Sequence, residues 1–326
     1  MFLRNVDVYF SKPDGTTLHV VRSSEFPNTY ICEGSFTRTE AYSSTDSCVL
    51  SVYNLSPAIR CTIALGGYNL ITICYGYKDD TTEYHNEEIN SANILFRGTM
   101  RRMQYMRNDA ATSVTQFYIL DCGVFTGESF MSGSFADGVN LYEIMEDIKR
   151  HNRDNKWGLE HIILSDTLKD YQLKGNRAYF GPVDDIMNTI AQENGFVYER
   201  CNSGIALMSL DEVINKTEVE AIDFTDNTSG IIGIPELTDD GVFISCLTTN
   251  KLHIHSLIKI DNSKLSTAQN LQEYSAQAGA TIDPDGLYVV ININGTFTNS
   301  GNECSMKLKT IARSWFAKLN SSGATA

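Results

Sequence analysis

The sequence is short of basic residues, of proline and of long apolar runs. It has 26 Lys and Arg against 40 Asp and Glu, a formal net charge of −14, and only 6 prolines in 326 residues. Proteins hold duplex DNA through Lys and Arg that neutralise phosphates, so this charge balance makes the chain a poor candidate for holding DNA and disfavours binding to an anionic membrane surface. No stretch approaches the ~20 apolar residues of a membrane-spanning helix. We therefore expect a soluble, non-exported chain that does not insert into a membrane.

The signatures of common enzyme classes are missing as well. Neither the phosphate-binding string G-x-x-x-x-G-K nor the dinucleotide string G-x-G-x-x-G occurs, and the G-x-S-x-G elbow and the H-E-x-x-H zinc helix are also absent. Carboxylates are plentiful, but nothing singles out two of them as a glycosidase pair, and no signature supports a Cys–His nucleophile. We expect no catalytic residue, no cofactor and no enzyme activity.

The eight cysteines give no sign of a disulfide or metal framework. None of them forms a C-x-x-C pair, and most lie in alternating apolar runs such as Ser47-Cys48-Val49-Leu50. A disulfide framework needs an oxidising compartment, and the N-terminus does not resemble a signal peptide. The cysteines are therefore predicted to be free, buried thiols.

Two further patterns suggest metals at first sight. His253 and His255 flank Ile254 in a predicted strand, where the alternation places both imidazoles on one face about 7 Å apart. No third zinc ligand lies nearby, so we interpret them as two exposed histidines on a polar strand face. The run Asp283–Gly286 begins like a calcium loop, but its glycine comes too early and Asn294 stands where the bidentate glutamate belongs. We interpret that run as a turn and expect no metal site.

What the sequence does contain is strands at both ends and helices in the middle. With 42% hydrophobic and 20% charged residues it is able to form real cores. Alternation and turn residues predict strands over Thr29–Thr39, Ser47–Leu55, Asn69–Tyr77, Ile94–Met106 and Ser113–Asp121. After Phe125 the apolar period changes to 3.6, which predicts helices near 139–150, capped by Asn140, and over 182–194, ended by Gly195. A hairpin is predicted over 196–210.

The last third returns to strands. They are predicted over Val242–Leu247, Leu252–Ile260, Leu287–Asn294 and Ser305–Ile311, while Lys264–Ala280 is either a short helix or an insertion loop. Leu70-Ile71-Thr72-Ile73 is echoed by Leu257-Ile258-Lys259-Ile260, each followed by a polar insert and another strand. The sequence thus predicts an α+β, mainly β fold with β domains at 1–124 and 216–326 around an α+β domain at 125–215, and the echo favours two related β units.

The order of these pieces resembles a known family. The run Asp46–Leu55, then Leu70–Tyr77 ending in Gly-Tyr, then Ile94–Met100 with its Phe-x-Gly string are similar to the first domain of phage tail baseplate hub proteins. That family includes the T4-type hub, the late control protein D group and the N-terminal part of type VI secretion spike proteins. The segment from Gly181 to Phe196 resembles its helix-plus-hairpin domain. The family's usual Pro-Gly turn is replaced here by His255-Ser256, and its usual His near the last hairpin by Asn294.

The resemblance implies two tail-tube-like antiparallel β-barrel domains in one chain. It further implies a homotrimer whose six barrels adapt a hexameric tail tube to a trimeric central spike in the virion's baseplate, assembled in the host bacterial cytoplasm. Its implied partners are the spike protein and the tail tube protein, with the tape measure protein and baseplate wedge or sheath proteins as further candidates. Genome DNA would pass through without specific binding. The alternatives are another tube-fold tail or secretion component, such as a distal tail protein or a spike protein fragment, and a tail-associated hydrolase.

A cluster of acidic residues gives the channel hypothesis its one sequence-level candidate. The cluster lies in a polar insert and consists of Asp79, Asp80, Glu83, Glu87 and Glu88. It is either a solvated loop or an acidic strip at an interface or in the lumen. A net-negative lumen would repel DNA phosphates within a screening length of about 8 Å. On this hypothesis the strip keeps DNA from adhering during ejection.

Overall fold

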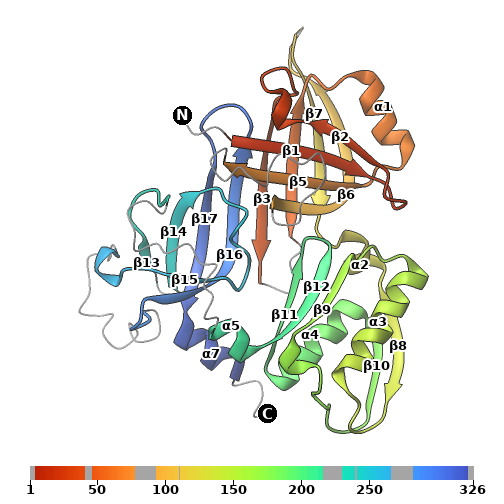
Figure 1. The fold of residues 1–326 in the computed structure, drawn as a ribbon, viewed down its shortest axis with the longest axis vertical. Coiled ribbons are helices and arrows are strands. Elements are labelled where there is room, and N and C mark those ends of the chain that lie inside the picture. Colours follow the sequence, from red (N-terminus) through yellow and green to blue (C-terminus); the bar gives the residue numbers. More distant parts are fainter. Residues whose placement is uncertain are drawn as a thin grey trace.

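The computed structural model describes residues 4–40, 46–77, 93–109, 111–215, 230–238, 241–265 and 282–321, and Figure 1 shows how they are arranged. Strands from the two ends of the sequence lie side by side in one large sheet, and a helical body formed by the middle of the chain lies at one end of that sheet (Figure 1). The predicted α+β, mainly β fold is confirmed. Within the described residues, no helix is both long and apolar enough to cross a membrane.

The large sheet contains twelve described strands, all paired antiparallel. From the first third come β1 (Arg4–Ser11), β2 (Thr17–Val21), β3 (Cys32–Thr39), β4 (Ser47–Tyr53), β5 (Leu70–Tyr77), β6 (Ile94–Arg107) and β7 (Ser113–Leu120). From the last third come β13 (Glu236–Thr238), β14 (Gly241–Leu247), β15 (Leu257–Lys259), β16 (Leu287–Thr298) and β17 (Ser305–Ala312). Their order is β13-β14-β17-β16-β3-β4-β7-β6-β5-β1-β2, and β15 also pairs with β16.

This order contains an internal repeat. Strands β3, β4, β7, β6 and β5 lie side by side in this order, and strands β13, β14, β17, β16 and β15 lie side by side in the equivalent order. The registers match too, because Leu70 pairs with Thr99 and Leu257 pairs with Val289. Each unit has a bulge at the equivalent place, between Met100 and Arg102 in β6 and between Val290 and Asn292 in β16. The chain therefore holds two β units of the same topology, which we call unit 1 (β3–β7) and unit 2 (β13–β17).

The two units are joined by strand pairing between β3 and β16 (Figure 1). At this joint Phe36 lies opposite Gly295, and Phe297 lies opposite Gly34. A Cβ atom on either glycine would come within 2.4 Å of the facing phenylalanine ring. Each glycine thus provides the space that the opposite ring occupies, and one continuous apolar core runs beneath both units.

The middle of the chain forms a separate core. It comprises α2 (Gly123–Glu128), β8 (Phe130–Phe135), α3 (Leu141–Asn155), β9 (His161–Leu164), β10 (Arg177–Pro182), α4 (Val183–Asn194), β11 (Phe196–Cys201), β12 (Gly204–Ser209) and α5 (Leu210–Ile214). Strands β8 and β10 form a ribbon, and β11, β12 and β9 a second small sheet. The Asn140 side chain accepts the Tyr142 amide at the start of α3, and Gly195 ends α4 with a φ of 69°. We call this part the middle body.

Two helices lie outside these groups. Helix α1 (Pro57–Gly66) connects β4 to β5 and begins with the Ser56 side chain accepting the Ile59 amide. Helix α7 (Arg313–Ser321) follows β17, and its Phe316 is buried against α5, β16 and β11. The amide of Ser314 donates to the Asp283 carboxylate, in the turn that precedes β16. This turn is the one predicted for Asp283–Gly286, with the Gly286 amide donating to the Asp283 carbonyl.

The predictions for the individual elements were mostly correct, with four differences. The predicted strand 252–260 is only Leu257–Lys259, because the chain turns at His255, whose φ is 60°. The helix predicted near 139–150 continues to Asn155. Cys61 is exposed, whereas the other described cysteine side chains are free and buried as expected. Strands β1, β2, β8, β9, β10 and β13 and helices α1, α2, α5 and α7 were not predicted.

Some predictions concern residues that the description does not cover. The acidic residues Asp79, Asp80, Glu83, Glu87 and Glu88 lie outside the described residues, and so does most of Lys264–Ala280. The roles expected for them therefore stay predictions. The domain limits 1–124, 125–215 and 216–326 also stay a proposal, now with the addition that the two β parts share one sheet.

Candidate functional site

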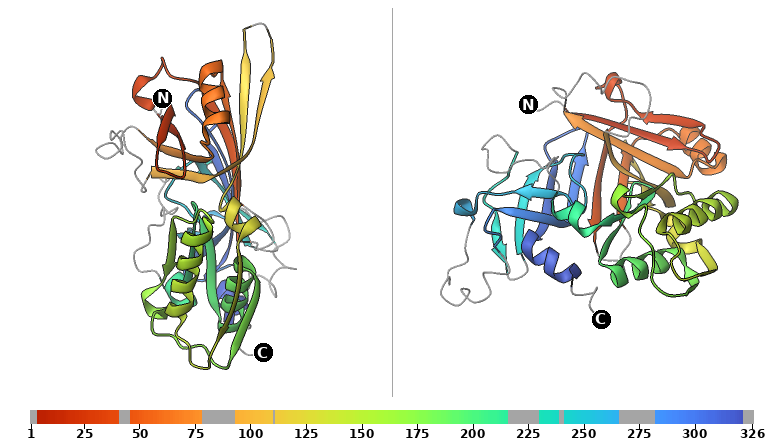
Figure 2. Two further views of the ribbon diagram at one scale, coloured as in Figure 1. Left: turned by 90° about the vertical axis from the view of Figure 1, so that its right-hand side faces the viewer. Right: turned by 60° about the horizontal axis from the view of Figure 1, so that its bottom comes forward.

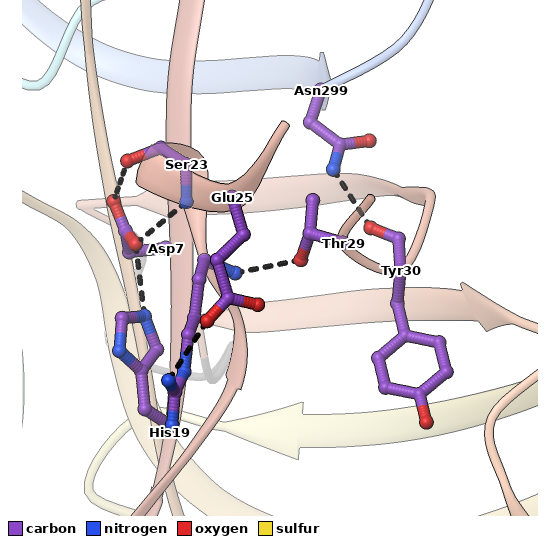
Figure 3. Close-up of polar contacts among 8 residues, drawn as sticks. Asp7, His19, Ser23, Glu25, Thr29, Tyr30 and Asn299 are labelled. Carbon is purple, nitrogen blue, oxygen red and sulfur yellow. Dashed lines mark hydrogen bonds and ion pairs between the residues drawn. The ribbon is translucent and has the colours of Figure 1, made fainter. Parts of the chain in front are cut away.

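Two clusters of polar side chains, each including buried charged groups, are candidates for a functional site, and the first lies on β1, β2 and the turn after β2 (Figure 3). The Asp7 carboxylate is nearly buried and accepts three hydrogen bonds in this cluster. The Ser23 hydroxyl donates to it at 2.6 Å, the Ser23 amide at 3.0 Å, and Nε2 of His19 lies 2.8 Å away. The His19 ring in turn stacks on Tyr9, with 4.1 Å between ring centroids.

Ser, Asp and His are the residues of a hydrolase triad, but their order here is different. In a triad the histidine lies between the serine and the aspartate, so that it can take the serine proton. Here Asp7 lies between Ser23 and His19, and the hydroxyl is bound to the carboxylate (Figure 3). This geometry does not activate a nucleophile. Asp7 instead holds the short helical turn Ser23–Glu25 on the edge of the sheet.

The second cluster lies where the middle body meets the sheet, and we call it the polar junction. Its first part is the tip of the β11–β12 hairpin, where Asn202 and Ser203 have φ values of 49° and 67°. Both of their amides donate at 2.6 Å to the buried carboxylate of Asp121, which follows β7. Two left-handed residues in a two-residue turn expose both amides on one side, and one carboxylate satisfies both. Asp121 thus attaches the middle body to unit 1.

Arg38 links the same hairpin to unit 2. It is 3% exposed on the core-facing side of β3, where an apolar residue would be usual. Its guanidinium donates to the Leu95 carbonyl at 2.8 Å and to the Asn202 side chain at 2.6 Å, and it lies 3.0 Å from Nδ1 of His253. One buried cation therefore contacts β6, the hairpin tip and the turn before β15.

His255 occupies the centre of the polar junction. Its ring is 2% exposed, with Nε2 at 3.4 Å from Glu40 and Nδ1 at 3.5 Å from Glu199. These are ion-pair distances, longer than a well-formed hydrogen bond. Burial alone lowers the pKa of a histidine, but Glu199 and Glu40 on its two sides raise the pKa of His255 to about 9. The imidazolium form therefore bridges the residue that follows β3 and strand β11 at neutral pH.

The carboxylates nearest to Arg38 respond to burial in the opposite direction. Burial raises the pKa of Asp46 to about 7, although the Arg38 charge and the Thr39 amide pull it down. Burial likewise raises the pKa of Asp121, again opposed by Arg38 and by the amides of the hairpin tip. A third buried carboxylate, Asp184 of α4, accepts the Tyr198 hydroxyl at 2.6 Å and pairs with Arg200 at 3.0 Å. The polar junction thus contains both signs of charge, each with partners.

An open cavity of about 830 Å³ adjoins the polar junction between α4, β11, β16 and α7. Its wall includes Glu40, His255, Asn188 and Lys309. No group of three or more His, Cys, Asp or Glu side chains in the described parts of the chain is placed to hold a metal ion. The geometry fits a structural connection between two bodies better than a reaction centre.

The structure revises what the sequence suggested about these residues. His253 and His255 were expected to be exposed on one strand face, and this was wrong, because they lie in a turn, with His253 beside Arg38 and His255 buried. Arg38 and Asp121 were missed. The signal was present for Arg38, since it follows the alternation of Cys32, Gly34 and Phe36 into the core.

Comparison with known proteins gives no match by sequence and several by structure. No protein-family profile and no curated protein matches the chain. The tail protein from Neisseria meningitidis MC58 superposes with a TM-score of 0.55 at 7% identity, covering 96% of this chain and 98% of that one. The 43 kDa tail protein of prophage MuSo2 from Shewanella oneidensis gives a TM-score of 0.52 at 6% identity, with coverage of 96% and 98%. The chain has the fold of phage tail proteins.

The same tail-protein fold extends to a further solved structure. A chain of the Francisella PdpA–VgrG complex superposes with a TM-score of 0.51 at 9% identity, over 95% of this chain and 58% of that chain. In this tail-protein fold the two β units and the middle body all have counterparts, because the two tail proteins are covered almost end to end. At such low identity the likeness concerns the fold, and no residue's role is transferred by it.

Proposed function

We propose that the chain is the structural hub of a phage tail baseplate. Three copies would form a ring of six β units, because each chain carries two, and 3 × 2 units match a hexameric tail tube on one side and a trimeric spike on the other. The observation that carries this proposal is the internal repeat, in which β3-β4-β7-β6-β5 recurs as β13-β14-β17-β16-β15. A closed ring of this kind needs a head-to-tail contact between unlike surfaces.

Such a ring would enclose the channel through which genome DNA leaves. A chain with a net charge of −14 has little to hold phosphates, so DNA would pass without specific binding. The proposed partners are the spike protein, the tail tube protein and, further out, the tape measure protein and baseplate wedge or sheath proteins. The location that follows is the tail baseplate of a virion.

The role we propose is not enzymatic. The cluster of Ser23, Asp7 and His19 has the aspartate in the middle, and the polar junction connects the middle body to the sheet. Two solved proteins of the same fold, from Neisseria meningitidis and from prophage MuSo2, are described as tail proteins. These observations support a structural subunit whose role is to assemble with other tail proteins.

Imaging of the purified protein tests the proposal. Negative-stain images at high concentration, classified for symmetry, are expected to contain threefold rings with an open centre and a pseudo-sixfold outline. The same experiment is repeated with the spike and tube proteins of the same phage present. Only monomers under both conditions would contradict the hub proposal and return attention to a hydrolase or to another tail component.

A further inference from the structure

The joint between the two units inside the chain shows how one β unit attaches to another. Along its edge away from β17, strand β16 pairs with two different strands. Its first part, up to Val289, pairs with β15, and its second part, from Asn292 to Thr298, pairs with β3 of unit 1. The bulge at Ile291 separates the two parts. A unit therefore offers the far part of its long strand as an edge for the first strand of the other unit.

Unit 1 has the same edge, and among the described strands nothing pairs with it. Strand β5 pairs with β6 only up to Thr99, and from Arg101 to Met106 the side of β6 away from β7 has no described strand partner. Figure 2 shows the upper end of the β6–β7 hairpin projecting beyond helix α1 and the rest of the sheet. Unpaired strand edges are usually covered or blocked, since they readily pair with other chains.

Unit 2 has the complementary edge, also without a described strand partner. Strand β13 is the equivalent of β3 and ends the sheet on the opposite side from β6 (Figure 1). Around it lie apolar side chains that water contacts, with Ile234 66%, Ile232 44% and Phe243 40% exposed. The chain thus has two unlike unpaired margins, one at each end of the run from β13 to β6.

We propose that β6 of one copy pairs with β13 of a second copy, as β16 pairs with β3 within each chain. The equivalences fix the register. Thr37 faces Ser47 and Thr238 faces Gly241 at the start of β4 and β14, so Thr238 corresponds to Thr37. Arg102 and Asn292 are the first paired residues after the bulges in β6 and β16. Gln104 and Asn294 each lie two residues further on, so Gln104 corresponds to Asn294. Since Asn294 faces Thr37, Gln104 faces Thr238 of the second copy, Tyr105 faces Leu237, and Met106 faces Glu236.

The side chains at these positions suit the pairing. Within the chain the Thr37 hydroxyl donates to the Asn294 carboxamide at 2.9 Å across the joint. Between copies the equivalents are again a threonine and a carboxamide, Thr238 and Gln104. Tyr105, which is 48% exposed in the single chain, gains Leu237 as an apolar cross-strand partner.

The consequence is a continuous sheet that runs through every copy. The contact is head-to-tail, because β6 and β13 are different surfaces, and such a contact gives either a closed ring or an open filament. Closure after three copies rests on the proposed function, while the edge pairing follows from the strand repeat.

Cysteine cross-linking tests the register. The background is Cys61→Ala, which removes the exposed cysteine among the described residues. A chain with Gln104→Cys and Thr238→Cys is oxidised at a concentration where the wild type self-associates, and the products are separated without reductant. A chain with Thr37→Cys and Asn294→Cys is the positive control, because those positions face each other within one molecule. A chain with Gln104→Cys and Leu237→Cys shifts the register by one residue and is the negative control.

We expect the 104/238 pair to form covalent dimers and then closed trimers at least tenfold faster than the 104/237 pair. If the 37/294 control forms its internal disulfide while the 104/238 pair cross-links no faster than the shifted pair, the edge pairing is overturned. Fast cross-linking that continues past three copies would support the edge pairing and contradict the trimeric hub. The two proposals therefore fail in different ways.

Discussion

At the scale of single residues, the polar junction is held by a few buried charges whose partners come from distant segments. His255 lies between Glu40 of the loop after β3 and Glu199 of β11, and Asp121 binds both amides of the hairpin tip. Buried charges contribute favourably only while each keeps its partner, and removing one partner leaves the other uncompensated. Single substitutions at the polar junction are therefore expected to affect stability strongly.

The first prediction concerns His255→Asn, a substitution that keeps a residue tolerant of left-handed φ. The pKa of His255 is about 9 in the fold and near 6.5 when unfolded. A raised pKa in the folded state adds stability below pH 6.5, and this stability is lost as pH rises from 6.5 through 9. Urea unfolding of the wild type should show that loss, and the variant should be less stable at pH 6 with a flatter profile. Parallel profiles for the two proteins would contradict the bridge.

The second prediction concerns Asp121→Ala. It leaves the buried Ser203 amide and the half-buried Asn202 amide without an acceptor, which should lower the free energy of unfolding by about 2–4 kcal/mol. The matched control is Asp137→Ala, since the exposed Asp137 carboxylate also accepts a backbone amide, that of Gly175. The control should cost less than about 1 kcal/mol, because water replaces its partner. Equal losses in the two variants would show that Asp121 does not hold the hairpin.

At the scale of elements, the β3–β16 joint depends on two glycines. Gly295→Ala would place a Cβ 2.4 Å from the Phe36 ring, and the ring has no room to move in a packed core. Overpacking of this kind costs typically 1–3 kcal/mol. Gly127→Ala in α2 is the control, because its Cβ would meet only the Arg101 guanidinium at 3.4 Å. Thermal unfolding should rank Gly295→Ala well below both the control and the wild type.

The sequence alone predicted most of the helices and strands but few of the contacts between them. The alternation in Ser47–Tyr53 and the 3.6-residue period in Leu141–Ile148 reflect which side of each element faces a core. Such a pattern can be recognised within the segment itself. The same reasoning failed at Leu252–His255, because Leu252 and Ile254 are buried whether the chain is extended or turning. Helix α1 was missed although Ser56-Pro57 and Gly66-Gly67 are ordinary start and stop signals.

Which segments meet at the joint and at the polar junction had no local signal, although the burial of Arg38 did. Thr37 and Asn294 are 257 positions apart, and nothing in either strand says which of several similar strands it will pair with. The polar junction draws Arg38, Asp121 and His255 from three segments, so their proximity exists only in the folded chain. The internal echo at Leu70–Ile73 and Leu257–Ile260 was the one sequence feature that indicated the repeat, and β5 and β15 occupy equivalent positions.

At the scale of the whole molecule, the charge of the chain bears on the channel. The strip Asp79, Asp80, Glu83, Glu87 and Glu88 is still predicted to line the lumen, where like charge would keep DNA from adhering. Replacing Glu83, Glu87 and Glu88 by Lys should slow genome ejection from assembled particles, measured as DNA release with time at physiological salt. Replacing them by Gln is the milder control. Unchanged kinetics in the Lys variant would remove this segment from the lumen.

The β3–β16 joint also determines when the protein is able to fold. Strand β3 leaves the ribosome about 250 residues before its partner β16 has been made, since Thr37 contacts Asn294. At 5–20 residues per second this delay is on the order of tens of seconds, during which one edge of unit 1 has no partner. A growing chain with an open strand edge is open to pairing with its neighbours on the same messenger. Synthesis of β16 is therefore also the event that closes this edge of unit 1 to pairing between nascent copies.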